Sequence, residues 1–157
     1  MAETPLQGIY VARDEDRFGD QHSLGIGVLS FKVSTADSHG TLLAVEVVHH
    51  TPGGPPRHVH LAQDEWFYVV EGAYVIEVGD QRWRLGPGDS VFGPRQVPHG
   101  WAYGGGARGR IAFAFTPAGH LEAFFRALST GQAMAPQDPA FWRPYAMEVV
   151  GPPVPVE

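Results

Sequence analysis

The chain has 157 residues, of which 43% are hydrophobic and 18% charged, and its formal net charge is −6. This composition is typical of one folded domain, and it argues against a disordered chain and against a nucleic-acid-binding protein, which would present a basic patch. Because the sequence has no cysteine, disulfides, thiolate nucleophiles and cysteine-bound metals are excluded. Any metal ion must be bound by nitrogen and oxygen donors.

The N-terminal sequence MAETPLQGIYVARDED lacks the basic start and the apolar run of a signal peptide. No apolar run elsewhere reaches the roughly 18 residues of a membrane span. We therefore expect a cytoplasmic protein that has neither a membrane nor a nucleic acid as its partner.

Twenty glycines and fourteen prolines separate short apolar runs that alternate along the chain. This pattern is typical of an all-β domain with many short strands and tight turns. The first twenty or so residues predict an arm or a single edge strand. Further strands, eight or so in all, are expected at residues 24–35, 42–48, 58–60, 65–72, 73–79, 82–85, within 87–94, and at 99–103 and 110–116.

After the last strand the apolar period changes to that of a helix. Thr116 is expected as the N-cap, with Pro117 at the first helical position, and Gly131 as the end. The apolar stripe of this helix consists of Leu121, Phe124, Phe125 and Leu128. Asp138 and Pro139 predict the start of a second short helix that runs through Trp142, and the tail GPPVPVE is expected to be extended.

The strand that begins at Glu65 is apolar on both faces. Phe67 and Val69 share the parity of Glu65, whereas the sequence neighbours Trp66 and Tyr68 point the other way. One face must line the barrel interior, and the other must be covered as well. A homodimer would cover it, although the C-terminal helices are an alternative.

Three histidines and one glutamate form a candidate metal site. His58 and His60 are separated by one residue, so on a strand they point to the same face with Cα atoms about 6.5–7 Å apart. Both imidazoles could then reach one ion at roughly 2.0–2.1 Å. Glu65 follows after a short loop and adds an oxygen donor, and His99 follows two prolines in a segment that could face the same cavity.

The two segments that contain these residues resemble the two conserved motifs of the cupins. Residues 53–72 (GGPPRHVHLAQDEWFYVVEG) are similar to the first motif, and residues 86–103 (GPGDSVFGPRQVPHGWAY) to the second. The resemblance implies a double-sheet jelly-roll barrel with two short C-terminal helices. It also implies that the metal ligands are His58, His60, Glu65 and His99. Tyr103 stands where the second motif often has Asn, which alters a common contact around the site.

The resemblance implies one cupin domain over residues 1–157. Its parts are an N-terminal arm with strands (1–52), the motif-bearing barrel core (53–116), and the C-terminal helices and tail (117–157). Among the other histidines, a structural role is expected for His22, His39 and His120. His49 and His50 have opposite parity at a strand end, so one of them is expected to face the mouth of the cavity, also in a structural role.

The chain as a whole resembles the small single-domain bacterial cupins that are similar to quercetin dioxygenases, including the helix AGHLEAFFRAL. This resemblance implies a dioxygenase acting on a flavonol-like or other enolisable aromatic molecule, with Glu65 as both ligand and catalytic base. Four protein ligands leave open positions on one Fe, Mn, Ni, Co, Cu or Zn ion per chain. The residues expected to line the substrate pocket are Phe67, Phe92, Trp101 and Tyr103.

Two other functions remain open at this stage, because the cupin barrel carries many chemistries. One is a non-catalytic module that binds a small molecule. The other is a metal-dependent isomerase or lyase, which would turn over without dioxygen.

Overall fold

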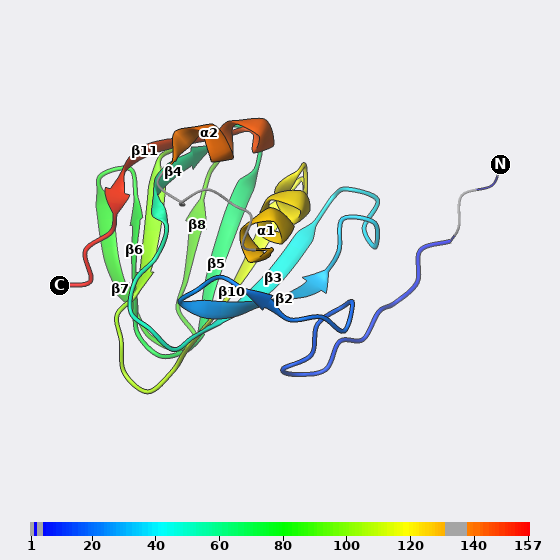
Figure 1. Ribbon diagram of the computed structural model, residues 1–157, viewed down its shortest axis with the longest axis horizontal. Coiled ribbons are helices and arrows are strands. Elements are labelled where there is room, and N and C mark those ends of the chain that lie inside the picture. The colour runs from blue at the N-terminus through cyan, green and yellow to red at the C-terminus, as the bar shows by residue number, and fades with distance from the viewer. Residues whose placement is uncertain (1, 3–4, 131–137) are drawn as a thin grey trace.

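The computed structural model describes residue 2, residues 5–130 and residues 138–157. Two antiparallel sheets pack face to face (Figure 1). The six-stranded sheet has the order β1-β2-β3-β10-β5-β8, and the five-stranded sheet has the order β11-β4-β9-β6-β7. The strands are β1 (His22–Ser23), β2 (Gly27–Val33), β3 (Leu43–His49), β4 (Pro56–His60), β5 (Asp64–Glu71), β6 (Tyr74–Val78), β7 (Gln81–Leu85), β8 (Ser90–Gly93), β9 (His99–Tyr103), β10 (Gly109–Thr116) and β11 (Met147–Pro153).

The core lies between the two sheets and follows the alternation of the strands. On β5 the side chains of Glu65, Phe67 and Val69 are buried, whereas Trp66 is exposed. On the neighbouring β10, Phe113 is buried and pairs with Phe67 in register. The predicted parity of β5 is thus confirmed, since a strand with one interior face buries every second side chain.

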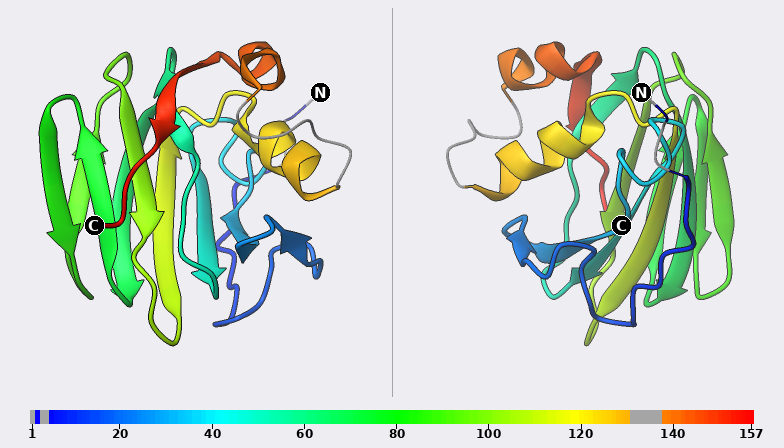
Figure 2. Two further views of the ribbon diagram at one scale, coloured as in Figure 1. Left: turned by 60° about the vertical axis from the view of Figure 1, so that its left-hand side comes forward. Right: turned by 90° about the vertical axis from the view of Figure 1, so that its right-hand side faces the viewer.

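Two short helices follow β10 and lie outside the sheets on one side of the barrel (Figure 2). They are α1 (Leu121–Ser129) and α2 (Pro139–Trp142), and a turn of 3-10 helix (Arg143–Tyr145) follows α2. The prediction that Thr116 caps the first helix is wrong. Thr116 still pairs with Asp64 as the last residue of β10, and the N-cap of α1 is His120. The expected helix end at Gly131 lies outside the described residues.

Asp138 begins α2 as the sequence predicts, because its side chain accepts a hydrogen bond from the Ala140 backbone N–H at 3.0 Å. Replacing Asp138 by Ala is expected to lower the free energy of unfolding by about 1 kcal/mol, since an orphan N–H at the helix start loses its acceptor. Chemical denaturation measures this loss. Asp138→Asn keeps an acceptor and serves as the matched control, so equal losses in both variants would contradict the capping role.

The number of strands and the C-terminal segment differ from the sequence-based expectation. The described part of the chain contains eleven strands rather than eight or so. Before β1, which has two residues, the described N-terminal residues form turns and irregular structure, so the predicted alternative of an arm is confirmed and that of an edge strand is not. The segment after α2 is more than an extended tail, because β11 pairs with β4 along its length.

The outer face of β5 remains apolar and open. Trp66 is 42% exposed and pairs in register with Phe92 of β8, which is 58% exposed. The helices do not serve as a cover here, because the apolar residues of α1 and α2 pack over the opening between the sheets instead. A homodimer that covers this face stays a prediction.

Neither α1 nor α2, in the part of the chain described, has the length and apolar character needed to cross a bilayer.

Candidate metal centre

Strands of both sheets contribute to one buried cluster of polar side chains. His58 and His60 lie on β4, and His99 lies opposite His58 on the adjacent β9. Glu65 enters from β5 in the other sheet. All four side chains are at most 5% exposed. The alternation of β4 places both of its histidines inward, so the i, i+2 spacing in the sequence becomes a pair of donors on one face.

The donor atoms converge on a common point. One ligand atom from each of the four residues lies within 4.8 Å of the others. The Glu65 Oε2 atom is 2.8 Å from His99 Nε2 and 3.1 Å from His60 Nε2. In His58, the ring nitrogen Nδ1 lies 2.8 Å from the Pro56 carbonyl oxygen. Because a carbonyl only accepts, Nδ1–H donates to it, which leaves Nε2 of His58 unprotonated and able to bind a metal.

The charges of the site are those that metal ligands need. Burial lowers the pKa of His58 well below its usual value, and the neighbouring His99 and His60 lower it further, so this imidazole is neutral. Burial alone would raise the pKa of Glu65, but the adjacent imidazoles of His99 and His60 outweigh burial and lower it. His58 therefore offers a neutral imidazole nitrogen and Glu65 an ionised carboxylate, the protonation states in which these two groups bind metal.

A divalent ion fits this donor set. His60 Nε2, His99 Nε2 and Glu65 Oε2 are buried and lack a well-aligned hydrogen bond to any described residue, although they lie close together. Buried polar atoms are normally paired, because leaving them unpaired costs free energy. Donor atoms that lie around one point without hydrogen bonding to each other have the arrangement of ligands around an ion. The cluster is thus a candidate site for one divalent metal, bound by nitrogen and oxygen donors.

Aromatic rings hold the ligands in place. The Phe67 ring packs edge-on against His99 with centroids 5.5 Å apart, and the Phe115 ring lies 5.6 Å from that of His60. The Trp142 ring of α2 lies 4.8 Å from that of His58. The sequence gives no direct sign of this last contact, because it depends on how the C-terminal segment folds back over the barrel.

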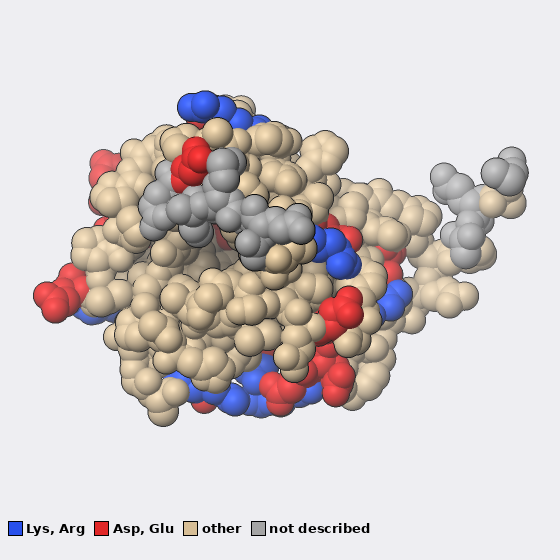
Figure 3. Space-filling view, viewed as in Figure 1, with Lys and Arg blue, Asp and Glu red and all other residues tan. Residues whose placement is uncertain are grey.

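The metal centre opens into a cavity of about 690 Å³. His58, His60 and Glu65 form part of its wall, whereas His99 lies behind them. The rest of the wall is mostly apolar and comes from both sheets and both helices, with no Lys or Arg among the described lining residues. On the face that carries α1, most charged side chains in view lie toward the periphery (Figure 3).

The four residues predicted to line the substrate pocket lie in different places in the structure, and only one of them lines the cavity. Trp101 lines the cavity. Phe67 and Tyr103 are fully buried beside it, and neither contributes to its described wall. Phe92 lies on the outer surface, because it pairs with the outward-facing Trp66. The wall residues that the prediction omitted include Phe124 and Phe125, which the sequence placed only on the apolar stripe of a helix.

A second group of potential donors, Asp16, Asp20 and His22, lies near the N-terminal segment. The Asp16 carboxylate accepts backbone N–H groups of Phe18 and Phe31 at 2.8 and 2.7 Å. This carboxylate thus holds the N-terminal segment against β2, and a structural role for His22, as expected, is consistent with that.

The comparison with known proteins agrees with this architecture. Residues 45–115 match the family model described as "Cupin domain", and this segment contains all four candidate ligands. The barrel has the cupin fold. Its two antiparallel sheets and its C-terminal helices confirm the fold class that the two motifs implied.

Solved structures with the cupin fold superpose on most of the chain. KdgF from Halomonas sp. is 22% identical with a TM-score of 0.59, and the match covers 71% of this chain and 94% of that one. An RmlC-like cupin from Shewanella frigidimarina is 23% identical with a TM-score of 0.57, covering 73% and 96%. Oxalate decarboxylase from Bacillus subtilis is 17% identical with a TM-score of 0.54, covering 63% and 28%. At these identities the likeness shows the fold alone.

Among curated proteins, Epoxidase atD from Aspergillus terreus is 48% identical over 40 residues. The match covers 26% of this chain and 12% of the epoxidase, so the chain corresponds to only a small part of that protein.

Proposed function

We propose that this protein is a metal-dependent dioxygenase that acts on a flavonol-like or other enolisable aromatic small molecule. The observation that carries the proposal is the opening of a buried three-histidine, one-glutamate cluster into a large cavity with apolar walls. Such a wall favours a flat, uncharged ligand over a phosphorylated or strongly anionic one. The resemblance to the quercetin dioxygenase group, read from the motifs and the C-terminal helix, points to the same substrate class.

The histidine ligands and the glutamate ligand have different roles in this proposal. His58, His60 and His99 hold the ion, and the hydrogen bond from His58 Nδ1 to Pro56 fixes the orientation of the first of them. Glu65 supplies the fourth donor and also takes the hydroxyl proton of the enolisable substrate at Oε2. A bound Fe, Mn, Ni, Co or Cu ion would supply open positions for oxygen ligands together with Lewis-acid and redox chemistry. Zn would supply the open positions and the Lewis-acid chemistry without the redox chemistry.

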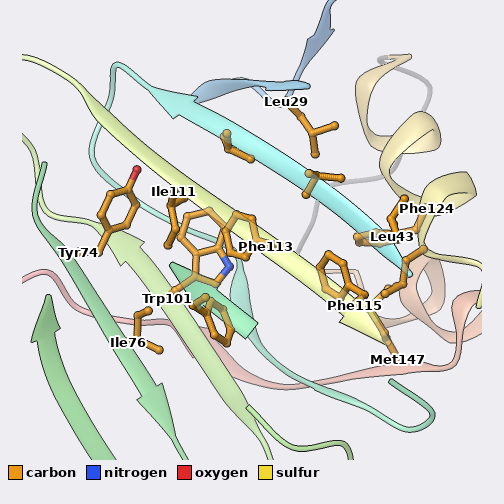
Figure 4. Close-up of a cluster of buried hydrophobic side chains, with 14 of the residues drawn as sticks. Leu29, Leu43, Tyr74, Ile76, Trp101, Ile111, Phe113, Phe115, Phe124 and Met147 are labelled. Atoms are coloured by element: carbon orange, nitrogen blue, oxygen red, sulfur yellow. The ribbon is translucent and has the colours of Figure 1, made fainter. Parts of the chain in front are cut away.

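The cavity walls have two tasks. Trp101, Phe113 and Phe115 lie along the core between the sheets and offer flat surfaces to an aromatic ligand (Figure 4). The apolar residues of α1 and α2 line the opening and limit the access of bulk water to the ligands. A dry site strengthens the attraction between Glu65 and a substrate proton, because fewer water molecules compete for either group.

The test is oxygen consumption by protein that has been freed of metal and reloaded with Fe(II), Mn(II), Ni(II), Co(II) or Cu(II), in the presence of a flavonol panel. We expect uptake that requires both the ion and the flavonol. It should disappear in His99→Ala and persist in His50→Ala, which changes an exposed histidine. Flavonol binding without oxygen uptake would instead identify a binding module, and turnover without oxygen would identify an isomerase or lyase.

A further inference from the structure

A second polar group lies in the cavity, away from the metal ligands. His49 ends β3, is fully buried and forms part of the cavity wall. Its Nδ1 atom lies 2.8 Å from the Tyr74 hydroxyl oxygen. Its Nε2 atom is buried and has no hydrogen-bond partner among the residues that the structure describes. Buried ring nitrogens are normally paired, so an orphaned one beside an apolar cavity indicates a ligand atom that would complete it.

The hydrogen on this imidazole can be placed from its surroundings. Burial lowers the pKa of His49 to about 4 and raises the pKa of Tyr74 above its usual value, so both groups are neutral near pH 7. His49 Nδ1 is the acceptor that the described residues offer to the Tyr74 hydroxyl hydrogen. The assignment that leaves no hydroxyl hydrogen unbonded has the phenol donating to Nδ1, with the single ring hydrogen on Nε2. His49 thus presents an N–H donor.

Aromatic neighbours fix the orientation of this donor. The rings of Tyr74, Trp101 and Tyr103 surround His49 with centroid distances of 5.6, 5.2 and 5.7 Å. Tyr103, which replaces the Asn of the usual motif, stacks almost parallel to the imidazole. An imidazole enclosed on several sides cannot turn its Nε2 atom elsewhere without displacing rings of the core.

The donor and the metal centre lie at different ends of the core. Tyr74 lies at one end of the core cluster and Phe115 at the other, with Trp101 and Phe113 between them (Figure 4). Trp101 follows His99 by two residues on β9, and the His49 ring packs against Trp101. Two residues of strand span about 7 Å, so the two polar sites are on the order of 10 Å apart. A ligand that reaches both must span about this distance, as an aromatic molecule with more than one ring does.

We propose that His49 is a specificity-determining residue that donates a hydrogen bond from Nε2 to an acceptor oxygen at the end of the substrate remote from the metal. The inference rests on the proposed function and narrows its substrate class. The substrate is an apolar polycyclic molecule with one oxygen group that binds the ion and a separate hydroxyl, ether or carbonyl oxygen at its far end. Tyr74 acts as a positioning residue for the imidazole.

The first test compares ligand binding to the metal-loaded protein without turnover, under anaerobic conditions. The probes are unsubstituted flavonol and its ring-hydroxylated relatives kaempferol and quercetin, and the readout is quenching of tryptophan fluorescence. Wild-type protein is expected to bind the hydroxylated probes about 5- to 10-fold more tightly than flavonol. His49→Leu should abolish this preference, whereas His50→Leu should retain it. A preference that survives in His49→Leu, or that is absent from the wild type, would overturn the inference.

The second test does not depend on a ligand. If His49 and Tyr74 serve a substrate, replacing both with apolar groups of similar size should leave the metal-free barrel as stable as the wild type, because no buried polar atom remains unpaired. The double variant His49→Leu/Tyr74→Phe should therefore keep its Tm and its affinity for Mn(II). A large fall in Tm would show that the pair is a structural part of the core and would overturn the inference. Oxygen uptake by the wild type tests the dioxygenase separately, so the two proposals can fail independently.

Discussion

Replacing His99 by Ala is expected to lower the affinity of the protein for a divalent ion by more than about 100-fold, because loss of a direct ligand should exceed the 10–100-fold cost typical of an outer contact. His99 is 1% exposed, and its Nε2 atom lies 2.8 Å from Glu65 Oε2. Its removal takes one nitrogen donor from the centre and leaves a buried gap that no neighbouring ligand can fill. Titration of metal-free protein with Mn(II), Co(II), Ni(II) and Zn(II), followed by calorimetry, measures the change.

The same experiment has a thermal readout. Saturating metal should raise the Tm of the wild type, since an ion that binds only the folded state stabilises it by about 2.7 kcal/mol at 100 times Kd. His99→Ala should show little of this rise, and His50→Ala should show all of it. Equal affinity and equal thermal shift in the wild type and His99→Ala would rule out the proposed ligand set.

Replacing Phe67 by Ala is expected to lower the free energy of unfolding of the metal-free protein by about 3–5 kcal/mol. The side chain is fully buried on β5, where its ring packs edge-on against Phe113 at 5.6 Å and against His99 at 5.5 Å. Its loss opens a void between the two sheets and removes the surface that holds His99. Urea denaturation measures the stability change, and the metal titration should show a smaller loss of affinity than in His99→Ala.

Phe92→Ala is the matched control for this variant. It deletes the same ring from the adjacent strand, but Phe92 is 58% exposed on the outer face of the single chain, so its loss should change the stability of the monomer by about 0.5 kcal/mol or less. Similar losses in the two variants would contradict the assignment of one phenylalanine to the core and the other to the surface.

Local spacing explains what the sequence could predict. The i, i+2 pair of His58 and His60 and the parity of Glu65 with Phe67 are properties of single strands, so they follow from the two-residue period of the backbone. Asp138 followed by Pro139 is likewise a local signal, and α2 begins there. The structure brings the four proposed ligands together because the two motif segments pair as β4 and β9 and face β5.

Features that depend on register could not be read from spacing. Phe92 faces outward because it pairs with Trp66, and that partner is set by the turn between Pro87 and Asp89 rather than by the alternation of β8. Thr116 and Pro117 look like a helix start, yet the ladder with Asp64 extends β10 through Thr116. In both cases a long-range pairing outweighed the local preference.

His49 illustrates a further limit of sequence reasoning. Its parity correctly predicted that one of two adjacent histidines faces the cavity, and the structure buries His49 while His50 is exposed. The orphaned Nε2 atom and the contact with Tyr74 arise only when β3, β6 and β9 are assembled. Neither could be inferred from residues that are 25 positions apart in the chain.

The position of β4 links metal retention to the end of the chain. This strand contributes two ligands and lies between β9 and the edge strand β11, in which Met147 pairs with His60 and Val149 with His58. An edge strand separates from its sheet at a lower free energy than an inner one. We therefore expect the rate at which a bound ion escapes to depend on the strand farthest in sequence from both motifs, so that a change near Val149 shortens the residence time of the metal while every ligand remains intact.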